Sequence, residues 1–240
     1  MKKFLYTLYL KLKLDFRNKE ILITFYIVPL IFYTFMSIVF TSIMPETKET
    51  LIASMSIFAV TMGSLVGTPG TIIEYFKVDI KKSFKSSNIP LWVIPLTSFV
   101  SSFVNLLFVC LIIFVTAPIF FEAEKPLNIL MYFSSYALFL VATLCLGIIL
   151  GLYSKSVSKL TMYSQLVFLP SMMLSGIMFP AEMLPSFLRY IGLIFPATHG
   201  MKLLSGETVD FFSVIFLVLI IVISLFLIII KLKKLKYENA

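Results

Sequence analysis

The sequence predicts an all-α protein that crosses a membrane several times. Hydrophobic residues make up 60% of its 240 residues and charged residues only 13%, whereas globular proteins usually carry about 25% charged residues. The apolar residues gather in long runs, and basic residues gather in alternate segments between these runs. Length therefore limits the number of crossings, and residues 1–240 are expected to form one transmembrane domain.

Six apolar windows are long enough to cross a bilayer. A helix needs about 20 residues to do so, because it covers about 30 Å of hydrocarbon at about 1.5 Å per residue. The windows are residues 21–43, 51–73, 91–120, 127–152, 161–180 and 209–230. We therefore expect six transmembrane helices, of which the third and fourth are long enough to tilt.

Residues 1–20 are expected to form an amphipathic helix at the membrane interface. Apolar side chains recur there at helical spacing, apart from the basic ones, at Leu5, Leu8, Leu12 and Phe16. The alternation KLKLDF at residues 11–16 would also fit a short strand. The first apolar run is longer than the core of a cleaved signal peptide, so no such peptide is expected.

The distribution of Lys and Arg predicts the orientation of the chain. Most basic residues lie in four segments, 1–20, 74–90, 153–160 and 231–240. The alternate segments hold only Lys48, Lys125, Arg189 and Lys202. Because basic loops stay in the cytoplasm, both termini are expected there. The net charge of +8 then reflects contact with anionic membrane lipids, and no aromatic-interleaved basic groove suggests nucleic acid.

Several kinds of chemistry are disfavoured. The windows contain no Lys, Arg, Glu or His, and Asp210 lies at the edge of the last one, whereas ion-coupled transporters need ionisable groups at membrane depth. Cys110 and Cys145 lack metal-ligand spacing, and His199 is expected to be an ordinary polar residue. No catalytic residue, metal or cofactor is therefore expected. The GxxxxGK[ST] loop that binds ATP phosphates is also missing, so energy for transport would come from another chain.

The basic segment after the second window, EYFKVDIKKSFKSSNIP, is the expected docking site for such a chain. Phe76, Ile80 and Phe84 recur every four residues and would form an apolar ridge on a short helix. Lys81 and Lys82 would lie on its other sides. The same pattern would fit a helix lying flat on the inner leaflet, and the pattern alone leaves both interpretations open.

Two glycine pairs have the small-xxx-small spacing that lets helices approach closely. They are Gly63 and Gly67 in GSLVG, and Gly147 and Gly151 in GIILG. The pairs are expected to pack helices within the bundle or to form a subunit interface.

The segment before the last window is too apolar for a solvated loop and too broken to cross a membrane. Its punctuating residues are Phe179, Pro180, Pro185, Pro196 and His199. Proline interrupts helical hydrogen bonding, and broken backbone at membrane depth survives only under protein or water. Residues 181–206 are therefore expected to form short helices at the membrane surface.

Together these features resemble the type-2 ABC exporter permeases, the group of drug, polyketide and polysaccharide export permeases. The likeness in span order covers the whole chain and is most specific in SGIMFPAEMLPSFLRYIGLIFPATHGMKLL, residues 175–204. It implies that residues 181–206 fold back as re-entrant helices on the outer side and help form an exit gate. It also implies a coupling helix in residues 74–90. The chain departs from the family after Glu74, where KVDIKKSF replaces the glycine-containing run of many members.

The resemblance implies the permease subunit of an ATP-driven exporter in a bacterial cell membrane. Two copies of a separate ATPase subunit would bind ATP and Mg²⁺, and a second permease protomer, identical or similar, would complete the pathway. A lipophilic or amphipathic substrate (a drug, an antibiotic peptide or a lipid-linked molecule) would move outward by alternating access. The alternative is a sensor or immunity protein that binds a ligand without transporting it.

Overall fold

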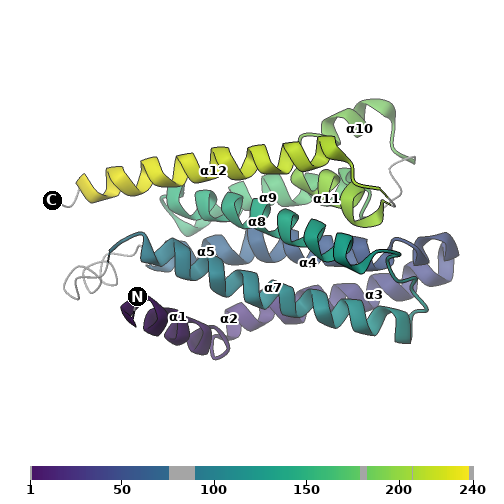
Figure 1. Ribbon diagram of the computed structural model, residues 1–240, viewed down its shortest axis with the longest axis horizontal. Coiled ribbons are helices and arrows are strands. Elements are labelled where there is room, and N and C mark those ends of the chain that lie inside the picture. Colours follow the sequence, from purple (N-terminus) through teal and green to yellow (C-terminus); the bar gives the residue numbers. More distant parts are fainter. Residues whose placement is uncertain (1, 76–89, 179–182, 207, 238–240) are drawn as a thin grey trace.

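A computed structural model describes residues 2–75, 90–178, 183–206 and 208–237, and every regular element in these ranges is helical (Figure 1). Long helices run side by side in a bundle. The first and last described residues lie at one end of it, which we call the α1 end. Helices α10 and α11 lie at the opposite end, the α11 end.

The elements follow one another along the chain with short connections. They are α1 (Lys2–Asp15), α2 (Lys19–Leu22), η1 (Ile23–Ile27), α3 (Val28–Ile43), η2 (Pro45–Lys48), α4 (Leu51–Met62), η3 (Gly63–Gly67), α5 (Thr68–Tyr75), α7 (Val93–Phe120), α8 (Ile129–Tyr153), α9 (Val157–Leu174), α10 (Ser186–Gly192), α11 (Pro196–Ser205) and α12 (Phe211–Tyr237). Elements η1 and η3 are π-helical, and η2 is a 3₁₀ turn.

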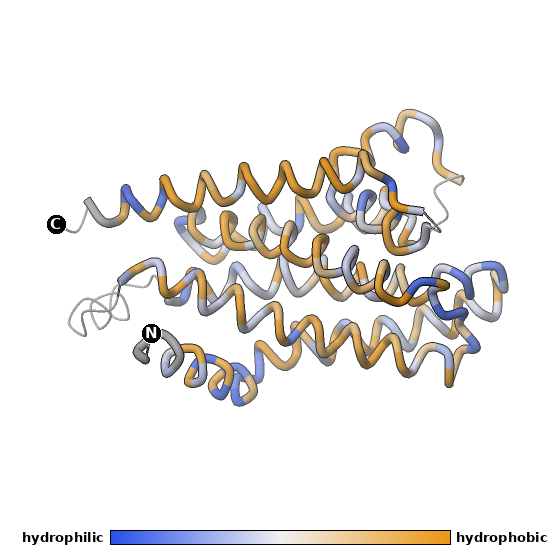
Figure 2. Tube along the Cα trace, viewed as in Figure 1, coloured by the Kyte–Doolittle hydropathy of each residue, from blue (hydrophilic) through white to orange (hydrophobic). Residues whose placement is uncertain are grey.

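Among the described residues, five helices are long and apolar enough to cross a membrane. They are Lys19–Ile43, Leu51–Glu74, Val93–Phe120, Ile129–Tyr153 and Phe211–Leu235. Figure 2 shows apolar residues along the length of the bundle and polar residues gathered near its ends. The all-α class is therefore confirmed, and these five helices correspond to five of the six predicted windows.

The remaining window, 161–180, corresponds to α9, whose bounds differ from the prediction. The helix begins earlier, at Val157, and ends at Leu174, because Gly176 adopts a φ of 85° that continues no right-handed helix and that glycine accepts without strain. Polar residues such as Lys159 and Gln165 reduce its hydropathy. Helix α9 is not among the five, so a sixth crossing stays a prediction.

The N-terminal segment forms helix α1 and not a strand, and its polar side faces the bundle. Lys11 and Asp15 are each 5% exposed, whereas Tyr9 and Leu14 are exposed. Lys11 Nζ lies 2.9 Å from the Asp15 carboxylate, and the hydroxyl of Ser101 in α7 donates to the same carboxylate. Helix α1 therefore docks through charged and polar groups and turns apolar side chains outward, as an interfacial helix would.

The helix formed by α4, η3 and α5 lies at the centre, with 83% of its most apolar stretch buried. Its π-helical segment η3 precedes Pro69, just as η1 precedes Pro29. Proline donates no backbone hydrogen bond and its ring displaces the preceding turn, which explains why the helix widens at both places. The Thr68 hydroxyl donates to the Gly63 carbonyl at 3.0 Å within this segment.

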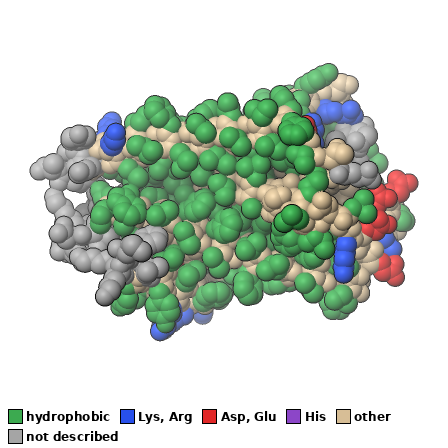
Figure 3. All heavy atoms as spheres, viewed as in Figure 1, with side chains coloured by type: hydrophobic (Ala, Val, Ile, Leu, Met, Phe, Trp, Pro, Cys, Tyr) green, Lys and Arg blue, Asp and Glu red, His purple; other side chains and the backbone are tan. Residues whose placement is uncertain are grey.

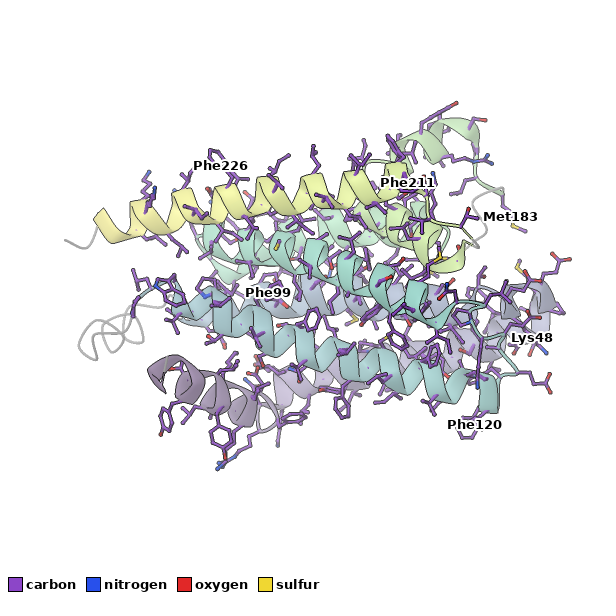
Figure 4. All side chains as sticks on the ribbon, in the orientation of Figure 1. Lys48, Phe99, Phe120, Met183, Phe211 and Phe226 are labelled. Atoms are coloured by element: carbon purple, nitrogen blue, oxygen red, sulfur yellow. The ribbon has the colours of Figure 1, made fainter. Side chains whose placement is uncertain are left out.

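The outer surface of the bundle suits a lipid environment. Figure 3 shows apolar side chains along the visible face, with charged side chains toward the ends. On α12 only 22% of the most apolar stretch is buried, and Phe226, labelled in Figure 4, points away from the bundle. The apolar belt would contact membrane lipids.

Candidate functional site

Two hollows lie on the side of the molecule where α3 and α9 both pack against α4. We call this side the α3–α9 face; it also includes η1, η3 and α5. One hollow is near the α11 end of the bundle and the other near the α1 end.

The hollow near the α11 end has a volume of about 670 Å³. The end of α3, the start of α4, the residues after α9 and helix α11 all contribute to its walls. Its thioether and carboxylate side chains are those of Met44, Met178, Met183, Met201, Glu46 and Glu49. Because methionine side chains are flexible and polarisable, such walls can adapt to apolar ligands of irregular shape. Figure 4 labels Met183 near this end.

The hollow near the α1 end is smaller, at about 180 Å³. Ile21, Thr24 and Phe25 line it on the α3 side, and Val157 at the start of α9 lines it on the other. Glu74, which was predicted to take part in ATPase coupling, also borders it and is exposed. The other predicted coupling residues lie outside the described residues: Phe76, Ile80, Lys81, Lys82 and Phe84.

Three aromatic rings meet on the α3–α9 face. The rings of Phe32 in α3 and Phe58 in α4 stack with centroids 3.7 Å apart and an interplanar angle of 11°. Phe58 also contacts Phe168 of α9 edge to face, with centroids 6.1 Å apart. Sequence reasoning did not single out these residues, because 25 phenylalanines give no one position prominence.

The predicted gate segment forms two short helices at the α11 end. Pro185 directly precedes α10 and Pro196 is the first residue of α11, positions at which proline needs no helical N–H partner. Phe179 and Pro180, also predicted for the gate, lie outside the described residues.

His199, which was expected to be an ordinary polar residue, is buried with 0% exposure. Its Nε2 lies 2.9 Å from the Leu193 carbonyl and its Nδ1 lies 2.9 Å from the Ser213 hydroxyl. That hydroxyl donates to the Asp210 carboxylate at 2.6 Å. The imidazole also stacks on Phe216, with ring centroids 4.0 Å apart. His199 therefore fastens α11 to the start of α12.

The surroundings of His199 favour its neutral form. Burial lowers its pKa below the ordinary value of 6.5, although the bond to the Leu193 carbonyl opposes this effect. Lys202 also lowers the pKa and Asp210 raises it. The neutral ring must keep its proton on Nε2, because the Leu193 carbonyl can only accept. Nδ1 and the Asp210 carboxylate then share the one proton of the Ser213 hydroxyl. The pKa of Asp210 is lowered, chiefly by this hydroxyl.

We expect acid to loosen this attachment. A histidine whose pKa is lowered by folding binds a proton more readily when unfolded, so stability falls as the pH drops below the ordinary histidine value of about 6.5. The lowered pKa of Asp210 adds a loss at still lower pH. Thermal unfolding between about pH 7.5 and 5.5 should therefore shift more for the wild type than for His199→Gln, which cannot titrate. Equal shifts would contradict the assignment.

The structure places all four predicted glycines at close contacts within the chain. A methyl group at Gly147 would overlap the Ser64 carbonyl oxygen of η3, and one at Gly63 would overlap the Leu106 side chain. At Gly67 it would lie 2.6 Å from the Phe25 ring, and at Gly151 it would lie 2.8 Å from Cβ of Ile72. These glycines allow α8, η1 and α7 to approach the central helix.

The described residues carry no cluster suited to metal binding. No group of three or more His, Cys, Asp or Glu side chains is close enough among them to hold a metal ion. Cys110 and Cys145 are buried and free. The described part of the chain also contains the two hollows and helices that are interrupted by prolines.

Comparison with known proteins identifies the family. The family model described as ABC-2 type transporter matches residues 10–208 of the chain. The match begins within α1 and ends before α12, so it covers the central helix, both hollows and α11. No curated protein matches the chain. Since the matched region includes most of the 240 residues, the chain belongs to the ABC-2 type transporter family and is a transmembrane permease domain.

Proposed function

We propose that this chain is the permease subunit of an ATP-driven exporter that moves a lipophilic or amphipathic substrate outward by alternating access. The observation that carries the proposal is the pair of hollows on the α3–α9 face, one near each end of the bundle. A substrate could occupy one hollow and then the other as the helices between them move.

The energy source is a separate ATPase. The chain lacks a phosphate-binding loop, and membership of the ABC-2 family implies a partner ATPase subunit. Two copies of that subunit would hold ATP and Mg²⁺, and conformational change would reach this chain through residues 74–90.

A second permease protomer, identical or similar, covers the α3–α9 face. Large apolar side chains of α9 are exposed at Met162, Leu166, Leu169 and Met173. Exposed Lys159 and Thr161 precede them on the same helix. Helix α9 as a whole is not among the helices apolar enough to cross a membrane, so its exposed side is better suited to face protein or water than lipid tails. The pathway would then run between two protomers.

The α1 end is the cytoplasmic end, and the membrane is the bacterial cell membrane. Basic residues concentrate in α1, in the α8–α9 connection and at the end of α12, and basic segments remain in the cytoplasm. The hollow near the α11 end would then open outward. Its methionines suit an apolar body, and Glu46 and Glu49 would attract a positive charge, as on a cationic drug or antibiotic peptide.

Transport in a defined system tests the proposal. The chain is reconstituted in vesicles with its ATPase, and movement of a fluorescent cationic amphiphile is followed with and without ATP. We expect ATP-dependent transport only when both proteins are present, and no ATP hydrolysis by the permease alone. Hydrolysis by the clean permease would overturn the subunit assignment. Dye binding without movement, beside an active ATPase, would instead favour a non-transporting sensor.

Phe84→Ala should weaken ATPase binding. If Phe76, Ile80 and Phe84 form the ridge that enters the ATPase, truncating one aromatic anchor costs about 2 kcal/mol, or roughly thirtyfold in affinity. The measurement is the amount of ATPase retained by the permease in detergent, relative to wild type. Insertion should stay normal, because no predicted span is altered.

Lys81→Glu combined with Lys82→Glu provides the matched comparison. If residues 74–90 instead lie flat on the lipid surface, this double variant loses headgroup attraction of about 1 kcal/mol per charge and is the more harmful change. Wild-type ATPase retention with Phe84→Ala would refute coupling through the ridge.

A further inference from the structure

The three contacting phenylalanines, Phe32, Phe58 and Phe168, lie between the two hollows along α3, the central helix and α9. On α3, Phe32 lies about two helical turns from Phe25 of one hollow and about two turns from Phe40 of the other, or about 11 Å each way. On the central helix, Phe58 lies between Ser54 of the hollow near the α11 end and Val66 of the hollow near the α1 end. Along α9, Phe168 likewise lies between Ser175 and Val157. The rings therefore separate the hollows.

The contacts among the rings bridge α3 and α9 across the central helix. Phe58 is the fixed member, since it belongs to α4 and is 5% exposed. Phe32 and Phe168 are partly buried and pack on the core from the two flanking helices. Aromatic contacts of this type are favourable but individually modest, so they can hold a passage closed and still be broken by helix movement.

Both flanking helices are interrupted by proline beside their phenylalanine. Pro29 follows the π-helical segment η1 and lies three residues before Phe32. Pro170 lies inside α9, two residues after Phe168. Each proline removes a hydrogen bond from its helix, and helices bend at such positions.

We propose that Phe32, Phe58 and Phe168 form the barrier between the inner and outer hollows of the transport pathway. The barrier opens when α3 bends near Pro29 and α9 bends near Pro170, which draws Phe32 and Phe168 away from Phe58. This inference rests on the proposed export function, because it assigns the closed point of that pathway.

Thiol labelling tests the barrier without ATP, ATPase or substrate. In a background with Cys110→Ala and Cys145→Ala, Thr24→Cys places a thiol in the hollow near the α1 end, and Thr47→Cys places one in the hollow near the α11 end. A membrane-impermeant maleimide is added on the side that labels position 47. With the barrier intact, position 24 should label slowly from that side.

Truncating a ring should open the route to position 24. Phe168→Ala should raise its labelling rate by about fivefold, the shift expected from losing one aromatic contact, and Phe58→Ala should raise it further because Phe58 touches both partners. Phe35→Ala, which removes a 64% exposed ring one turn along α3, is the matched control and should leave the rate unchanged. Phe168→Leu covers the case in which the alanine variants do not fold.

The outcomes separate the two proposals. Unchanged labelling of position 24 in folded Phe168→Ala, Phe168→Leu and Phe58→Ala proteins would overturn the barrier, even if the wild type transports. An equal rise with Phe35→Ala would also overturn it, because the effect would then be general loosening. Absence of ATP-dependent transport by the wild type with its active ATPase would overturn the export proposal. The labelling rates would then still decide whether the three rings form a barrier between the hollows.

Discussion

Asp15→Ala should release helix α1 from the bundle. Asp15 is the meeting point of two buried interactions, the ion pair with Lys11 at 2.9 Å and the hydrogen bond from Ser101. Removing one partner of a buried ion pair typically costs about 3–5 kcal/mol, because the other charge stays buried. Helix α1 packs mainly on α7, so its local detachment relieves this cost before the whole bundle unfolds.

Hydrogen exchange and limited trypsin digestion in detergent measure the release. In Asp15→Ala the amides of α1 should lose protection and cleavage after Lys13 or Arg17 should accelerate, while the amides of α8 keep their protection. Lys13→Ala, at an exposed position of the same helix, is the control. The double variant Lys11→Met with Asp15→Leu removes both charges and should restore most of the protection. Protection of α1 in Asp15→Ala equal to that in the control would refute the anchoring role.

Much of the fold could be predicted because lipid imposes a simple length rule. Five predicted windows correspond to helices that differ from them by a few residues at most of their ends. Prolines predicted the starts of α10 and α11, since proline is favoured at the first turn and disfavoured inside a helix. Helix α9 differs from the window 161–180, because the left-handed Gly176 ends the helix at Leu174 and the helix begins at Val157, before the apolar run.

The direction in which α1 faces could not be predicted from its amphipathic pattern. The pattern separates apolar from polar sides but does not say which side meets protein, and for most helices the apolar side does. Here the membrane competes for the apolar side, so the polar side packs inward. One signal was present: Lys11 and Asp15 are spaced for an ion pair within a helix, and Ser101 and Asn105 are polar residues one turn apart in the third window.

The candidate pathway could not be predicted for a different reason. Hollows and ring contacts arise from residues far apart in the sequence, such as Phe32, Phe58 and Phe168, and among the described residues exposed phenylalanines outnumber buried ones, so residue type alone does not mark the inner rings. Prolines within the windows were the available indication, because Pro29, Pro69 and Pro170 mark where helices lose backbone hydrogen bonds.

Gly147 lies against the point where Pro69 interrupts the backbone hydrogen bonds of the central helix. In the π-helical register of η3 the Thr68 amide bonds to the Gly63 carbonyl, and the next residue, Pro69, has no N–H to offer the Ser64 carbonyl. Helix α8 approaches this carbonyl at Gly147, where a methyl group would overlap the oxygen itself. The absence of a side chain therefore allows α8 to lie directly against the central helix, an arrangement common where membrane helices pack through small residues.

Gly147→Ala should consequently destabilise the fold more than Gly63→Ala or Gly70→Ala. Overpacking a tight core typically costs about 1–3 kcal/mol, and the upper part of that range applies because the obstacle is backbone and cannot rotate away. The measurement is the loss of folded protein during thermal unfolding in detergent. Gly70→Ala is the matched control: a methyl group there meets nothing within 4 Å, so it should be neutral or stabilise by about 0.5–1 kcal/mol.

Gly63→Ala is the informative intermediate, since its obstacle is the Leu106 side chain, and Leu106→Ala should restore part of the loss. Rescue of Gly147→Ala by Ser64→Ala would argue against the carbonyl as the obstacle, because that change leaves the backbone in place.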